Sequence, residues 1–171
     1  LTVTPRLARR AEVALRQTIA GADFLTISLD HLILESLKEE AQQRKVDWNK
    51  IIDADVAGPG TRDWSNLIRL ASFAKARIKN KLTAQGKSLL LLDPGLLARL
   101  DLMDLVGELQ SKAGIATGIP SVWMLVPMEG QGLPILDGVA IPVITQAQWA
   151  KIPAIWLTTS ASPTEQKGIV S

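Results

Sequence analysis

The chain has 171 residues, of which 47% are hydrophobic and 21% are charged, and its formal net charge is +2. These values exclude a largely disordered chain and fit one domain with a sizeable core. The absence of cysteine excludes disulfides, thiolate metal ligands and thiol nucleophiles, and no apolar run reaches the ~18 residues of a membrane span. We therefore expect a cytoplasmic protein that does not enter a membrane. Because the sequence starts at Leu1 without a Met, we also expect a fragment of a longer protein.

Apolar residues at helical spacing dominate the first half of the sequence. They predict helices over about 5–20, 30–43, 48–57 and 63–82, of which the first ends at Gly21 and the second and fourth are capped by Asp30 and Asp63. The fourth helix has Phe73 in its apolar stripe. Residues 24–29 predict a short strand or a direct entry into the next helix. In the second helix we expect an inward face of Leu32, Ile33, Leu34 and Leu37 and an outward face of Lys38, Glu39 and Glu40.

Continuous apolar runs mark the strands of the second half. Residues 88–92 and 122–126 predict two buried parallel strands, joined by one helix from Pro94 to Gly114 in a βαβ unit. Residues 139–144 predict a further strand near an edge, because Pro142 cannot donate a backbone hydrogen bond. A short helix should follow over 146–151, and the polar tail over 158–171 should be disordered.

Together these elements predict one α/β domain over residues 1–157, helix-rich over 1–87 and βαβ-containing over 88–157. We expect a small, mainly parallel sheet of three or four strands, flanked by helices, with a helical N-terminal half.

No residue pattern in the sequence predicts a catalytic site or a cofactor. The triplet at 86–88 looks like the end of a phosphate-binding loop, but it precedes a strand and lacks the second glycine. His31 is the only histidine, and with Glu35 one turn later it supplies too few ligands for a metal. Asp93 follows a predicted strand and Asp137 lies near another, where open α/β sheets bind ligands, which makes them candidates for a strand-end site with Pro127. Capping of the following helix is the alternative role for Asp93.

A basic stretch and two tryptophans are candidates for binding. Between Trp64 and Leu92 there are six basic residues and no acid, which predicts either a solvated helix face or contact with nucleic-acid phosphates. These residues are Arg69, Lys75, Arg77, Lys79, Lys81 and Lys87. Of the five tryptophans, Trp123 is expected in the core, whereas Trp149 and Trp156 suit either a core edge or a protein interface.

Several short motifs follow one another along the chain. They are DW at 47–48 with Asp53 and Asp55, RDWSNL at 62–67, LDPGLLAR at 92–99, VWMLVP at 122–127, PILDG at 134–138 with IPV at 141–143, and QW at 148–149 with IP at 152–153 and WL at 156–157. Their order resembles the C-terminal region of very large bacterial phage-defence proteins. The family is the serine/threonine kinase component of BREX/Pgl-type systems or a related defence ATPase. The resemblance implies a terminal accessory domain, with kinase or ATPase chemistry elsewhere in the parent protein.

Three functions are compatible with the sequence. The first is a non-catalytic interaction domain that docks another defence subunit or another domain of its parent. The second is a DNA-backbone-binding module that uses the basic helix over 67–87. The third is a nucleotide or small-molecule sensor at the strand ends.

Overall fold

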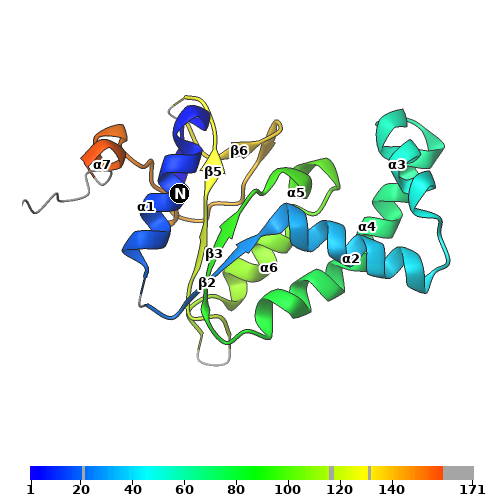
Figure 1. Ribbon diagram of the computed structural model, residues 1–171, viewed down its shortest axis with the longest axis horizontal. Coiled ribbons are helices and arrows are strands. Elements are labelled where there is room, and N and C mark those ends of the chain that lie inside the picture. The colour runs from blue at the N-terminus through cyan, green and yellow to red at the C-terminus, as the bar shows by residue number, and fades with distance from the viewer. Residues whose placement is uncertain (21, 116–117, 131, 160–171) are drawn as a thin grey trace, which may run out of the picture.

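Three parallel strands form the centre of the fold. The structure is a computed structural model, and it describes residues 1–20, 22–115, 118–130 and 132–159 (Figure 1). Its main sheet has the order β2-β3-β4, and both neighbouring pairs are parallel. These strands span Phe24–Ser28, Ser88–Leu92 and Val122–Met124. The predicted parallel pair is confirmed, because Leu90 lies opposite Trp123, and the segment before the second helix is a strand.

A second parallel pair forms a small sheet of its own, and the sequence did not indicate it. Strand β5 (Val126–Pro127) follows β4 after a single residue and pairs with β1 (Thr2–Val3). On its other side Thr2 forms a parallel bridge to Lys151. Strand β1 therefore lies between β5 and the segment around Lys151.

Strand β3 has apolar side chains on both faces and separates two core clusters. Leu89 and Leu91 point into the larger cluster, while Leu90 and Leu92 point into the smaller one. This alternation is the period of two that a strand imposes. Helices α1 (Ala8–Thr18) and α7 (Ala154–Thr159) cover the smaller cluster (Figure 1). The larger cluster is covered by α2 (Leu29–Gln43), α4 (Arg62–Thr83), α5 (Gly95–Arg99) and α6 (Asp104–Lys112). The result is the expected α/β fold with helices on both faces of the sheet.

The helices of the first half lie close to where the sequence predicted them. The first begins with a 3₁₀ turn at Pro5–Leu7, and Gly21, which was expected to end it, lies outside the described residues. The predicted caps are wrong. Ser28 caps α2 and Thr61 caps α4, each through a side-chain oxygen that accepts a backbone N–H. The other three helices of this half are α2 (Leu29–Gln43), α3 (Trp48–Ala57) and α4 (Arg62–Thr83).

The single helix predicted over 94–114 is two helices, α5 (Gly95–Arg99) and α6 (Asp104–Lys112). The chain bends between them at Asp101, whose φ is +56°. Leu100 and Leu102 on either side of the bend are both buried. Positions two residues apart point about 200° apart on a helix, so a continuous helix could not bury both against one sheet.

The predicted strand over 139–144 is much shorter and lies outside the main sheet. It is β7 (Val139–Ala140), which pairs antiparallel with β6 (Ile135–Leu136) across a tight turn at Asp137 and Gly138. Both turn residues have positive φ, as a two-residue hairpin loop requires. The predicted helix over 146–151 is only a 3₁₀ turn at Gln146–Gln148. Residues 158 and 159 belong to α7, and the rest of the predicted tail lies outside the described residues.

Four side chains differ in exposure from the sequence predictions. Leu34 is 41% exposed and Phe73 is 45% exposed, whereas Glu40 is only 6% exposed. Glu40 is on the face of α2 that packs against α4, where basic partners compensate its charge. Trp123, expected in the core, is 38% exposed and contacts Phe24 edge-on at 5.1 Å between ring centroids.

Helix α3 and the first half of α4 project from the body as an arm, which we define as residues 46–73 (Figure 1). Arg99 of α5 contacts the arm from the body. Its Nε donates to Asp55 Oδ1 at 2.8 Å, and its guanidinium lies 5.3 Å from the centre of the Trp64 ring. No helix in the described ranges is both long enough and apolar enough to cross a membrane.

Candidate functional site

Three aspartates lie close enough to interact at one edge of the fold, and two of them follow parallel strands. Asp93 directly follows β3, Asp137 is in the β6–β7 turn, and Asp30 lies just beyond β2. The pKa of Asp30 is raised above its ordinary value, first by desolvation and then by the negative charges of Asp93 and Asp137, while a backbone hydrogen bond opposes the rise. The structure therefore brings the two predicted strand-end residues near a third carboxylate, which the sequence analysis had assigned to a helix cap.

Asp30 has a structural partner at this edge. Its Oδ1 accepts a hydrogen bond from the backbone N–H of Leu96 at 2.7 Å, so it caps α5 from a different element. Asp93, predicted as a cap for this helix, does not cap it. Across the described residues no group of three or more His, Asp or Glu side chains is placed to hold a metal ion.

We expect Asp30→Asn to keep most of the stability of the protein and Asp30→Ala to lose about 1 kcal/mol, the usual value of a helix cap. An asparagine oxygen can still accept from Leu96, and it carries no charge to desolvate. Urea unfolding at pH 7 measures both variants. Equal losses in the two variants would show that the negative charge, and not the hydrogen bond, stabilises this edge.

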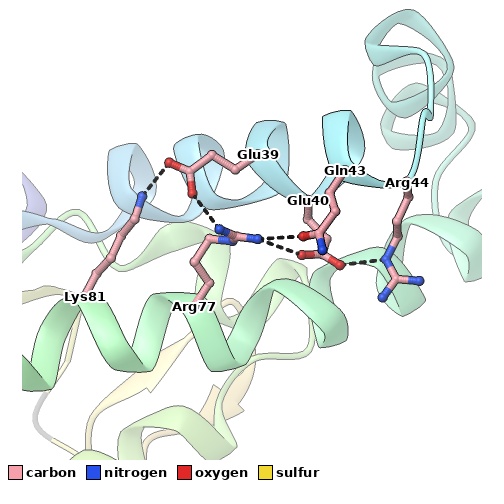
Figure 2. A network of polar contacts seen from close by, with 6 residues as sticks. All are labelled: Glu39, Glu40, Gln43, Arg44, Arg77 and Lys81. Carbon is pink, nitrogen blue, oxygen red and sulfur yellow. Dashed lines mark hydrogen bonds and ion pairs between the residues drawn. The ribbon is translucent and has the colours of Figure 1, made fainter.

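The basic residues of α4 are paired with acids from neighbouring helices. Lys75 and Lys79 contact Glu108 of α6, and Lys75 also contacts Asp104. On the other side α2 supplies the partners, as Figure 2 shows: Lys81 lies 2.9 Å from Glu39, and Arg77 lies 3.3 Å from both Glu39 and Glu40.

The remaining two predicted cations also have polar partners. Lys87 pairs with Asp23 at 3.0 Å, and Arg69 donates to Asn66 Oδ1 at 3.2 Å. Five of the six predicted residues thus have a carboxylate within ion-pair distance. The acids that are missing from the sequence of this stretch come from other segments, so its positive charge is largely balanced.

The ion-paired glutamates Glu39, Glu40 and Glu108 make the stability of the fold sensitive to acid. Hydrogen bonds from Lys75 and Lys79 lower the pKa of Glu108 to about 2, and basic partners also lower the pKa values of Glu39 and Glu40. A folded-state pKa below the unfolded value stabilises the fold at pH above about 4.5, and this contribution disappears as the pH falls toward 2.

We therefore expect urea midpoints to fall steadily between pH 5 and pH 2.5, since the raised pKa of Asp30 opposes this trend only in part. Glu108→Gln should flatten the pH dependence. Glu129→Gln changes an exposed carboxylate with no ion pair among the described residues, so it serves as the control and should leave the slope unchanged. If the urea midpoint of Glu108→Gln depended on pH as steeply as that of the unmodified protein, the ion pairs of Glu108 would not be the cause of the acid sensitivity.

The two predicted interaction tryptophans lie in different environments. Trp149 lines an open cleft of about 510 Å³ between β4, α6 and the segment over 134–150, and its buried Nε1 has no hydrogen-bond partner among the residues that the structure describes. Trp156 is a half-buried residue of α7 and packs against the smaller core cluster. The structure therefore does not join them in one surface.

A second hollow lies on the arm, between α3, α4 and the end of α2, with a volume of about 600 Å³. We call it the arm groove. Buried apolar residues form its floor, exposed Val46 and Phe73 form part of its edge, and four basic side chains surround it with one acid, Asp63. The basic residues are Arg44, Lys50, Arg62 and Arg69.

Of these four residues, only Arg69 belongs to the basic stretch between Trp64 and Leu92. The others come from three separate segments, and none stands in a basic run that would mark it. An aromatic residue, Phe73, inside the basic stretch was the available signal, but its helical spacing assigned it to the core.

Comparisons with known proteins found no matching family model, no matching curated protein and no matching solved structure. The functional proposals therefore depend on the geometry of the chain and on the motif resemblance described above.

Proposed function

We propose that this chain is a non-catalytic interaction domain of a larger phage-defence protein, and that it binds its partner through the arm groove. The arm groove is the observation that carries this proposal. It combines an apolar floor with an exposed aromatic ring and a charged rim, which is the composition of protein-binding surfaces. Its position on a projecting arm, which Arg99 contacts from the body, gives a partner free access.

Site-specific photo-crosslinking tests this function. The chain carries a benzoyl-phenylalanine in place of Val46 at the groove or, as the control, in place of Val13, which is exposed on α1. Purified candidate partners are the products of genes next to that of the parent. We expect a crosslink to one partner from position 46 and none from position 13. Failure to recover any partner above background, with the intact parent as well, would reject the interaction function.

DNA binding through α4 is a second proposal, and the ion pairs of Figure 2 weigh against it. A phosphate would have to displace carboxylates that already neutralise these cations. A mobility shift at low salt that disappears when Lys75, Arg77, Lys79 and Lys81 are neutralised would support it. The strand-end sensor is a third proposal, and thermal shift against a panel of nucleotides tests it.

A further inference from the structure

The arm groove runs along two helices. On α3 its lining residues are Lys50, Ile51 and Ala54, which recur on one face at one-turn spacing. On α4 the lining continues from Arg62 to Phe73, about three turns. A hollow of this shape between two helices of a hairpin fits a third helix better than it fits a compact ligand.

The floor of the groove offers apolar area to such a helix. Ile51, Ala54, Leu67 and Leu70 are buried at its base. Val46 is 38% exposed at the edge, and α4 presents Phe73 beside it. A helix with an apolar stripe would pack over this floor and remove the exposed side chains of Val46 and Phe73 from water.

Arg44 is held in place at one end of the groove. Its Nε donates to Glu40 Oε1 at 2.6 Å, and its guanidinium lies 3.6 Å from the centre of the Phe73 ring. Figure 2 shows its two terminal nitrogens turned away from Glu40, and neither donates to any residue that the structure describes. A guanidinium fixed by one edge and one face can offer its other edge to a carboxylate at small entropic cost.

The rest of the rim is unevenly charged. Lys50 and Arg62 are exposed and form no ion pair with a described residue, and Asp63 is the one acid in the lining. Because like charges repel, this rim disfavours a basic partner and attracts an acidic one.

We propose that an acidic amphipathic helix of a partner protein packs into the arm groove beside α3 and α4, with one of its carboxylates on the free edge of Arg44. This inference rests on the proposed function and names the chemistry of the partner. The apolar stripe of the helix faces Ile51 and Leu70, and its flanking acids face Lys50 and Arg62.

A titration monitored by NMR tests the chemistry without the natural partner. The probe is a designed peptide of Leu and Glu, about four helical turns long, with Leu on one face. We expect saturable shifts of the backbone amides of Val46, Ile51 and Phe73. A peptide of the same composition with the Leu residues spread around the helix, and one with Lys in place of Glu, should bind at least about tenfold more weakly.

Variants of the protein identify the contacts. Lys50→Glu with Arg62→Glu should weaken binding about tenfold, because two attractive charges become repulsive. Arg10→Glu makes the same type of charge change at an exposed position on α1 and should leave binding unchanged. Arg44→Lys keeps the charge but loses the planar edge, so it should also weaken binding, with a melting curve to confirm that the fold is intact.

The outcomes separate the two proposals. No saturable binding, equal binding of the Lys peptide, or shifts centred elsewhere would overturn the acidic helix. If position 46 still crosslinks to a partner in that case, the interaction function stands and only the chemistry of the partner is wrong. Groove shifts caused by a DNA duplex and not by the acidic peptide would replace the helix with a nucleic acid.

Discussion

Replacing Leu90 by Ala should lower the free energy of unfolding by about 3–4 kcal/mol, within the range for large-to-small changes in a tightly packed core. Leu90 is completely buried in the central strand and packs toward α1 in the smaller core cluster. That cluster also contains Leu15, Leu125 and Ile152. Because β3 is fixed between two neighbouring strands, the backbone has little freedom to close the cavity.

Urea unfolding followed by circular dichroism measures this change. The matched control is Leu34→Ala, which removes the same atoms from a half-exposed position on α2 and should change stability by less than about 0.5 kcal/mol. Equal losses at the two positions would contradict the placement of β3 at the centre of the molecule.

Glu40→Ala should cost about 2–3 kcal/mol at pH 7. Glu40 is nearly buried and accepts hydrogen bonds from Arg44 at 2.6 Å and Arg77 at 3.3 Å (Figure 2). Removing one partner of a buried ion pair leaves the other charge uncompensated, which costs 3–5 kcal/mol in a dry interior. The expected cost is smaller here because both arginines remain partly exposed and Arg77 retains its ion pair with Glu39.

The control is Glu35→Ala on the same helix, where the carboxylate is exposed and its ion-pair distances are 3.9 Å. The free energy of unfolding of this variant should lie within about 0.5 kcal/mol of that of the unmodified protein. The loss in Glu40→Ala should also shrink as the pH falls below 4.5. The unfolded chain then binds a proton at Glu40, whereas the lowered pKa of the folded state delays protonation there, so the stabilisation by this carboxylate is progressively lost. A loss that does not change with pH would assign the effect to packing alone.

Local sequence patterns predicted the elements whose burial is one-sided or complete. The run of four leucines after Ser88 identified the central strand, and the helical spacing of α2 and α4 placed both within a few residues. Where two possible caps stood close together, the pattern chose the wrong one, since Asp30 and Ser28 are both good capping residues. The bend at Asp101 depends on burying both Leu100 and Leu102 against a sheet that the sequence does not display.

The candidate site was less accessible to sequence analysis, because charge balance is a property of the folded chain. The stretch from Arg69 to Lys87 contains no acid, yet Glu39 and Glu108 come from helices before and after it. The reverse holds for Lys50 and Arg62, which lie in mixed sequence but share one groove without an acid paired to either in the described structure. The sequence pattern therefore suggested too many unpaired cations on α4 and did not indicate the unpaired cations of the arm groove.

The position of β1 has a consequence for the order in which the protein folds during synthesis. Leu1, just before β1, donates to the carbonyl of Met124, while Thr2 donates to the carbonyl of Ala150 and accepts from the N–H of Ile152. Nearly the whole domain must leave the ribosome before these residues find their partners, so the pairing of β1 with β5 is a late event. Contacts that span more than 120 residues raise the contact order, and we expect this pairing to be slower than the docking of α2 on α4.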